Sequence, residues 1–266
     1  MNKKNYLAPV VLFTYNRIDH LKKTINSLKK NELSKQSELI IFSDNSKSND
    51  DLLQVNKVRG YIRKISGFKN VKIHYRKYNF GLSKNITSGV TQILKKYSKI
   101  IIIEDDLVFN KHFLKYMNDG LEVFKKNTNV ASIHAYIYPI KFEKSFPEFF
   151  FLKGADCWGW GTWRRAWKKF DYNGMKLKKK LIKKKLINEF NFNNTYDYYK
   201  MLNDQINRKN DSWAIRWYAS AFLNNMLTLY PKYSFVNNIG TDGSGTHGSS
   251  KKTVNKILSR KKFQKI

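Results

Sequence analysis

The sequence is poor in the residues that cross-link a chain or carry it through a membrane. Its single cysteine, Cys157, excludes an internal disulfide and a zinc site built on several cysteines. No apolar run approaches the roughly 18 residues of a membrane helix. The apolar run that ends before Thr14 is only five residues long, too short for a secretory signal. Because an unpaired cysteine suits a reducing compartment, we expect a cytoplasmic protein, soluble or peripheral at the inner face of the cell membrane.

Two glycine-rich phosphate-binding motifs are also missing. Nothing like G-x-G-x-x-G follows the first predicted strand, and G-x-x-x-x-G-K-[ST] occurs nowhere in the chain. The first predicted strand runs instead into a short polar segment, residues 14–17. The sequence therefore differs from dinucleotide-binding dehydrogenases and gives no support to a P-loop nucleotidase.

Acidic residues are scarce. The chain holds 51 Lys and Arg against 20 Asp and Glu, a net charge of +31. Such an excess indicates an anionic partner, which can be nucleic acid, an acidic membrane surface or a phosphorylated substrate. Most of the lysines are scattered beside Asn and Ile, so a lysine-rich proteome is an alternative explanation. The hydrophobic content of 41% is ample for a core, in one large α/β domain or two small ones.

Three of the few acids stand together. Glu104, Asp105 and Asp106 follow four consecutive isoleucines, a run that predicts a buried strand of a parallel sheet. In open α/β sheets ligands bind at the carboxyl ends of the strands, and carboxylates are the oxygen ligands that Mg²⁺ and Mn²⁺ prefer. The alternative is that the acids only end the strand in a solvated turn.

Strands and helices alternate over the first hundred residues. Predicted strands at 9–13, 39–42, 71–75 and 99–104 are separated by helical patterns, as in βαβ units of a parallel sheet. Because such connections are right-handed, all four strands end at one edge. That edge would collect these polar residues and one turn glycine: Tyr15, Arg17, Asp44, Asn79, Gly81 and the acid triplet.

Four segments carry a family resemblance. VLFTYNR (11–17), SDNS (43–46), YNFGLSKNI (78–86) and IIIIEDD (100–106) together resemble the nucleotide-sugar-binding half of GT-A-type glycosyltransferases. The inverting N-acetylglucosaminyltransferase I-like group and bacterial nucleotide-sugar transferases are the most similar. The resemblance implies a GT-A (Rossmann-like) single α/β domain over residues 1–250, with a mostly parallel central sheet flanked by helices. Its nucleotide-sugar-binding half is 8–135, its acceptor and catalytic half is 136–250, and a basic tail follows at 251–266.

The resemblance also assigns roles to residues at the strand ends. Asp106 would ligate a Mn²⁺ or Mg²⁺ ion that bridges the donor diphosphate, and Asp44 would contact the uracil of a UDP-sugar. The other residues that it implies around the nucleotide and sugar are Thr14, Tyr15, Arg17, Asn79, Glu104 and Asp105.

All six tryptophans lie between residues 158 and 217. Trp163 and Trp167 are four residues apart on a predicted helix, a spacing typical of core packing. The glycines of the 158–161 segment suit a loop on which a sugar ring can stack. In the resembled family such a loop lines the sugar, which implies a donor-binding role for Trp158.

Asp211 is the predicted catalytic base. It precedes Ser212 and Trp213 at the start of a late predicted helix, where the resembled enzymes carry the carboxylate that takes the acceptor's proton. The alternative is that Asp211 only caps this helix, and Asp156 is the reserve base. His247 lies in a glycine-rich segment that the resemblance places over the diphosphate or the metal.

Residues 176–185 hold seven lysines. Leu177 and Leu181 fall on one side of a helix wheel while Met175 and Ile182 fall nearly opposite, so the segment is a poor amphipathic helix. A solvated basic surface is one interpretation. Attraction to anionic lipid or to a lipid diphosphate acceptor is the other.

These patterns, read with the family resemblance, imply a metal-dependent, inverting glycosyltransferase. It would move a sugar from a UDP-sugar to a hydroxyl of a glycan or lipid-linked glycan, in bacterial surface polysaccharide or lipopolysaccharide synthesis. One alternative is a basic nucleic-acid-binding protein, but the acids at the pocket's centre would repel a phosphate backbone, so no nucleic acid is expected. The second alternative is a nucleotidyltransferase. Such enzymes typically carry a Gly-rich loop after the first strand, and this sequence lacks one.

Overall fold

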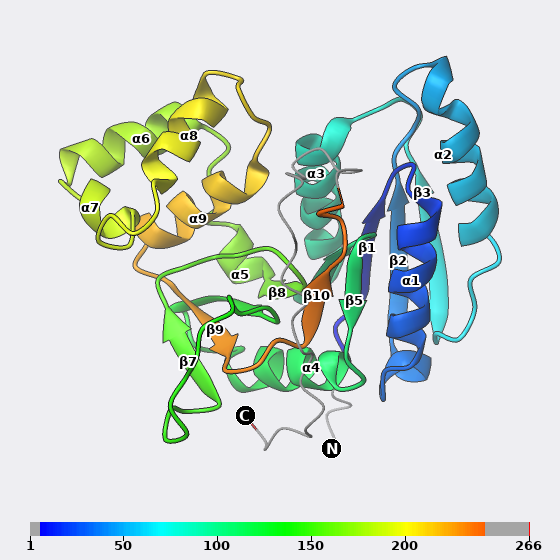
Figure 1. Cartoon of the computed structure of the whole chain (residues 1–266), viewed down its shortest axis with the longest axis horizontal. Helices are drawn as coiled ribbons and strands as arrows, with labels where there is room; N and C mark the ends of the chain where they lie inside the picture. The colour runs from blue at the N-terminus through cyan, green and yellow to red at the C-terminus, as the bar shows by residue number, and fades with distance from the viewer. Residues whose placement is uncertain (1–5, 243–265) are drawn as a thin grey trace.

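A computed structural model describes residues 6–242 and 266 of the chain (Figure 1). The strands, in chain order, are β1 (Val10–Thr14), β2 (Glu38–Ser43), β3 (Asn70–Tyr75), β4 (Lys99–Glu104), β5 (Leu107–Phe109), β6 (Val130–His134), β7 (Phe149–Leu152), β8 (Trp160–Trp163), β9 (Leu227–Pro231) and β10 (Val236–Asn238). The helices are α1 (Ile18–Lys29), the short 3₁₀ helix η1 (Ser34–Gln36), α2 (Asn49–Ile62), α3 (Gly81–Lys96), α4 (Phe113–Val123), α5 (Arg164–Trp167), α6 (Gly174–Lys183), α7 (Ile187–Phe190), α8 (Tyr198–Ile206) and α9 (Trp213–Leu223).

One large sheet runs through the molecule in the order β3-β2-β1-β4-β8-β6-β9-β7. Strands β3, β2, β1 and β4 are parallel neighbours, and β6 and β9 form a further parallel pair. Strand β8 is antiparallel between β4 and β6, and β5 and β10 form a separate antiparallel ribbon. The predicted fold class, a single α/β domain with a mostly parallel sheet, is confirmed. Since β8 lies between β4 and β6, the two predicted halves share this sheet, and a division near residue 135 stays a prediction.

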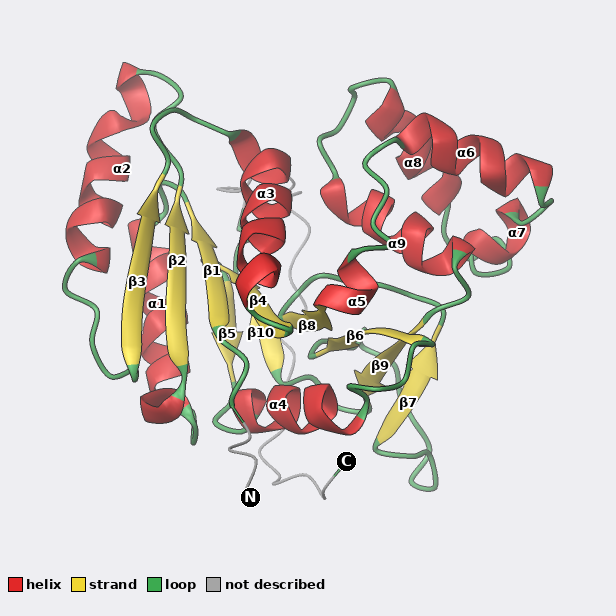
Figure 2. Cartoon of the chain, turned by 180° about the vertical axis from the view of Figure 1, so that it is seen from behind, coloured by secondary structure: helices red, strands yellow, loops and turns green. Residues whose placement is uncertain are grey.

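Both faces of the sheet are covered, as near-continuous apolar strands require. Val10 and Leu12 of β1 pack with α1, α2 and α4, while Val11 and Phe13 pack with α3, α5 and α9 (Figure 2). Because β3, β2, β1 and β4 are parallel neighbours, these four strands end together at one edge of the sheet. The acid triplet, at the end of β4, lies at that edge.

Helix α3 begins without a side-chain cap. The helix starts at Gly81, whose φ of +70° suits glycine, and its N-cap residue Phe80 makes no side-chain capping bond. Ser83 lies in the first turn, where its hydroxyl oxygen accepts a hydrogen bond of 2.6 Å from Nη2 of Arg216. Ser83 thus joins α3 to α9 instead of capping α3.

The tryptophan segment also differs from its prediction as a sugar-stacking loop. Trp160 and Gly161 belong to β8, and Trp160 is fully buried, with ring centroids 5.5 Å from Trp213 and 5.9 Å from Trp217. Trp163 and Trp167 are core residues as expected, but Trp163 ends β8 and does not lie on a helix. Glycine at 161 allows close packing, because a Cβ there would meet the side chain of Met117 at 3.0 Å.

Candidate active site

The ends of β1 and β4 are tied together by the acid triplet. Asp105, which is 4% exposed, accepts hydrogen bonds from the Thr14 hydroxyl at 2.8 Å and from the Tyr15 amide at 3.2 Å. Nη2 of Arg17 donates to Asp105 at 2.9 Å and to Asp106 at 2.8 Å. The structure therefore brings together five residues predicted to surround the nucleotide sugar or its metal.

The carboxyl groups of this cluster repel one another. Burial, with the charges of Asp106 and Asp105, raises the pKa of Glu104 to about 8. Burial and the charge of Asp105 also raise the pKa of Asp106, against the opposing effect of Arg17. Burial disfavours the charge of Arg17, but the two aspartates outweigh it and raise the pKa of its guanidinium. The cluster thus concentrates negative charge where a cation is favoured.

The segment after β10 lies directly on Asp106. The Ile239 amide donates to the Asp106 carbonyl oxygen at 2.8 Å, and a Cβ added at Gly240 would stand 2.2 Å from Oδ2 of Asp106. Nε2 of His20 and Oδ2 of Asp242 are 3.0 Å apart, which ties the same segment to α1. Glycine is required at 240 by this contact. The glycine pattern alone did not indicate a contact with Asp106, although the family resemblance placed this segment over the diphosphate or the metal.

The donor set fits a divalent cation if phosphate oxygens complete it. Within residues 6–242 and 266, no three His, Cys, Asp or Glu side chains converge as a metal site. Asp105 is engaged by three donors, so Asp106 is the carboxylate of the pair that could bind a cation. Nη1 of Arg17 is buried and has no hydrogen-bond partner in the described part of the chain. One carboxylate beside an unused guanidinium donor suits Mg²⁺ or Mn²⁺, which commonly bind through few carboxylates together with substrate phosphates.

Asp44 organises the turn that leads into α3. It is 4% exposed, and Oδ1 accepts from the amides of Asn45 and Phe80, both at 2.9 Å, while Oδ2 accepts from the Gly81 amide at 3.0 Å. Burial raises the pKa of Asp44, and the amide hydrogen bonds oppose that rise. Nδ2 of Asn79 donates to the Asn45 carbonyl at 2.7 Å. Because each carboxylate oxygen accepts about two hydrogen bonds, Oδ2 of Asp44 has room for one more donor.

The alternative interpretation, that Asp211 caps α9, is wrong. Ser212 is the N-cap, and its side chain accepts from the Ile215 amide at 3.3 Å. The exposed Asp211 accepts through Oδ2 from the Ser83 amide at 3.4 Å. Two carboxylates therefore accept hydrogen bonds at the amino end of α3. Asp44 accepts from the amides of Phe80 and Gly81, and Asp211 accepts from the amide of Ser83.

The other predicted site residues make separate hydrogen bonds or lie outside the described residues. Asp156 accepts from the hydroxyls of Tyr138 at 3.1 Å and Tyr230 at 2.6 Å, so both oxygens of the reserve base are engaged. The Trp158 amide donates to Nε2 of His134 at 3.2 Å, and its ring meets Tyr136 edge-on. His247 and all of the predicted tail except Ile266 lie outside the described residues.

Two further residues emerge only from the structure. Thr24 of α1 donates to the Asp105 carbonyl at 2.7 Å and fixes the triplet's backbone. Arg216 contacts Ser83, the residue that also holds Asp211. Neither had a sequence signal, because both contacts join segments that are far apart in the chain.

Comparison with protein families agrees with this geometry. Residues 10–209 match the model of glycosyl transferase family 2. The fold, a single α/β domain with a mostly parallel central sheet, agrees with the GT-A type of this family. The chain belongs to glycosyl transferase family 2. Among curated proteins, none matches the chain.

Two solved glycosyltransferase structures are similar to parts of the chain. TarS of S. aureus, residues 1–349 in complex with UDP-GlcNAc, is 17% identical with a TM-score of 0.37 over 53% of this chain and 37% of that chain. The mannosyltransferase PcManGT of Pyrobaculum calidifontis, in complex with GDP-Man and Mn²⁺, is 11% identical with a TM-score of 0.37 over 50% and 37%. The matched part thus spans little more than a third of each of these two chains.

Proposed function

We propose that the chain is a metal-dependent, inverting glycosyltransferase that moves a sugar from a UDP-sugar to a hydroxyl of a glycan or lipid-linked glycan. Its cellular role would be the synthesis of bacterial surface polysaccharide or lipopolysaccharide in the cytoplasm. One observation carries the proposal: the amino end of α3 holds Asp44 and Asp211, while the cluster of Arg17, Asp105 and Asp106 ends the neighbouring strands β1 and β4.

The donor would lie along this edge. Oδ2 of Asp44 has one acceptor position left, which suits the single N–H of a uracil ring, and the buried Nη1 of Arg17 suits a diphosphate oxygen. Asp106 would hold the metal. A bound Mn²⁺ or Mg²⁺ would neutralise charge on the leaving diphosphate.

Asp211 would act on the acceptor. The acceptor oxygen attacks the anomeric carbon while the bond from that carbon to the diphosphate oxygen breaks, and UDP leaves. Asp211 takes the proton of the attacking hydroxyl. Its exposure and its single long hydrogen bond to the Ser83 amide leave the carboxylate accessible for this transfer. Because the base and the leaving group stand on opposite sides of the reacting carbon, the anomeric configuration inverts.

Donor hydrolysis tests the proposal. UDP-sugars and GDP-sugars are incubated with the protein and Mn²⁺, and the release of nucleoside diphosphate is measured for the wild type and Asp106→Asn. We expect slow release from a UDP-sugar that requires Mn²⁺ and is lost in the variant. Release from GDP-sugars alone, or equal release by the variant, would contradict the proposed donor and metal roles.

A further inference from the structure

Helix α6 has two apolar sides, and the protein core uses only one of them. Leu177 and Leu181 are 2% and 0% exposed and pack in the cluster that contains α8 and α9. Met175 and Ile182 lie on the other side of the helix and are 44% and 48% exposed. They are seven residues apart, or two turns, so they share one outward side. The opposed apolar residues that made the sequence a poor amphipathic helix therefore serve two different environments.

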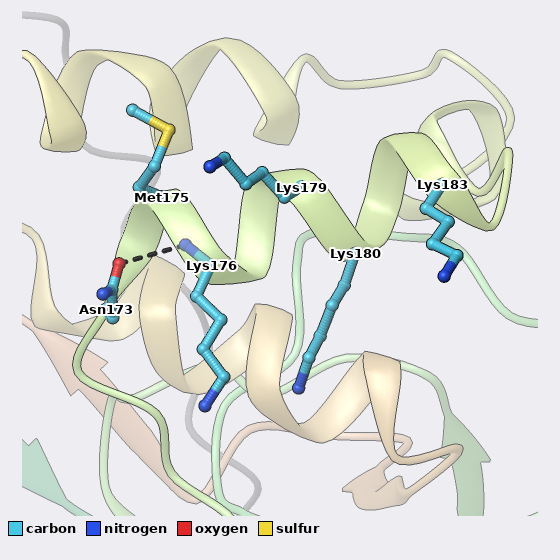
Figure 3. A pocket seen from close by; sticks show the side chains of 6 residues that line it. All are labelled: Asn173, Met175, Lys176, Lys179, Lys180 and Lys183. Atoms are coloured by element: carbon cyan, nitrogen blue, oxygen red, sulfur yellow. Dashed lines mark hydrogen bonds between the residues drawn. The ribbon is translucent and has the colours of Figure 1, made fainter.

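Lysines surround this outward side. A cavity of about 360 Å³ runs along it, lined by Asn173, Met175 and four lysines (Figure 3). We call these four the α6 lysines: Lys176, Lys179, Lys180 and Lys183. All four are exposed, and within the described residues only Lys176 forms an ion pair, with Asp171 at 2.9 Å, while the charge of Lys180 also acts on Asp171. The outward side of α6 is therefore strongly cationic beside two exposed apolar side chains.

We infer that this outward side of α6 docks the protein on an anionic lipid surface. Lysines beside a membrane are attracted to anionic headgroups, and their flexible chains let apolar neighbours approach the boundary of the acyl chains. Met175 and Ile182 lie along one edge of this row of lysines and would enter that boundary. A soluble polyanion would satisfy the lysines equally well but would give Met175 and Ile182 no apolar environment. The exposed apolar pair therefore favours a lipid surface.

Docking at α6 would also serve transfer to a lipid-linked acceptor. Helix α6 packs on α9, and Asp211 lies two residues before the first residue of α9. Figure 1 shows α6, α7, α8 and α9 as one lobe beside the sheet. A membrane that binds α6 thus holds the lobe that carries Asp211. This last step rests on the proposed function, whereas the docking itself does not.

Vesicle sedimentation tests the docking. The full chain is mixed with phosphatidylcholine vesicles with and without phosphatidylglycerol. We expect binding only to the vesicles that contain phosphatidylglycerol. Each lysine near an anionic surface contributes about fivefold to binding, so replacing all α6 lysines with Gln should weaken it by on the order of a hundredfold or more. Met175→Ser with Ile182→Ser, which leaves the charge unchanged, should weaken it by about tenfold.

A control variant removes the same charge elsewhere. It carries Gln at four exposed lysines near α1 and α2, namely Lys23, Lys30, Lys57 and Lys64. This variant should bind vesicles within about threefold of the wild type. An equal loss in the control would show that only net charge acts. Binding of the wild type to inorganic polyphosphate but not to vesicles, or full vesicle binding by the double Ser variant, would likewise overturn the inference.

The two proposals can fail separately. The melting temperature of each variant is measured with and without UDP and Mn²⁺. The α6 variants should keep the wild-type nucleotide response, which also shows that they are folded. If wild-type protein binds the anionic vesicles but gives no nucleotide response, the docking stands and the proposed function fails.

Discussion

Gly240→Ala should damage the site through a single added methyl group. The new Cβ would stand 2.2 Å from Oδ2 of Asp106 and 2.9 Å from both Cβ of Asp106 and Nη1 of Arg17. The Asp106 oxygen must withdraw by about 1 Å to reach an ordinary contact distance. Such a shift stretches its 2.8 Å bond to Arg17 beyond hydrogen-bond length.

The cost of this clash can be estimated. Overpacking costs about 1–3 kcal/mol, and a chain of this size loses about 2–4 °C of melting temperature per kcal/mol. A 1 Å displacement of a catalytic group lowers turnover by about a hundredfold. We therefore expect Gly240→Ala to melt several degrees below the wild type and to lose most of its stabilisation by UDP and Mn²⁺.

Thermal melting with and without UDP and Mn²⁺ measures both effects. Gly60→Ala is the matched control, because no atom lies within 4 Å of its added Cβ and the residue is interior to α2. That variant should gain up to about 1 kcal/mol from helix propensity and keep the full nucleotide response. If Gly240→Ala behaves like Gly60→Ala, the segment after β10 does not press on Asp106 and the reasoning is wrong.

Three further predictions concern the base, the core and pH. Asp211→Asn should keep its melting temperature and UDP binding but lose sugar transfer, while Ser212→Ala should lose about 1 kcal/mol of stability and keep transfer; the reverse pattern in the two assays would make Asp211 structural. Trp160→Ala should cost about 3–5 kcal/mol in denaturant unfolding, and a cost below about 1 kcal/mol would contradict its core position. Burial lowers the pKa of His74 below 6.5, so the unfolded chain binds the proton more readily and stability should fall as pH drops below about 6.5. His74→Phe should flatten the dependence of the unfolding free energy on pH between about pH 5 and 7. An unchanged slope would show that His74 does not cause this pH dependence.

The sequence was sufficient for the parallel strands and for the edge where they end. Each strand has a short apolar run, and the acids of the triplet follow directly in the chain, so local pattern alone located them. Helix starts were harder to predict. Asp211 and Ser212 are adjacent and both can cap, and only the observed hydrogen bond of Ser212 to the Ile215 amide separates them.

Contacts between distant segments were beyond local pattern. The glycines around Trp160 indicated a loop, yet Gly161 is small because β8 packs closely on Met117. Gly240 faces Asp106 although the two are far apart in the chain, and Ser83 joins Asp211 to α3 in the same way. Such pairs depend on how the sheet and its helices are assembled, which residue spacing does not encode.

The central claim is that Asp106 and Arg17 hold a UDP-sugar through a divalent ion. Calorimetric titration of UDP tests it directly, with and without Mn²⁺, on wild type and Asp106→Asn. We predict binding by the wild type that weakens at least tenfold when Mn²⁺ is removed, and a variant that binds UDP weakly whether or not Mn²⁺ is present. Equal UDP affinity in all four titrations, or no UDP binding in any of them, would contradict the account.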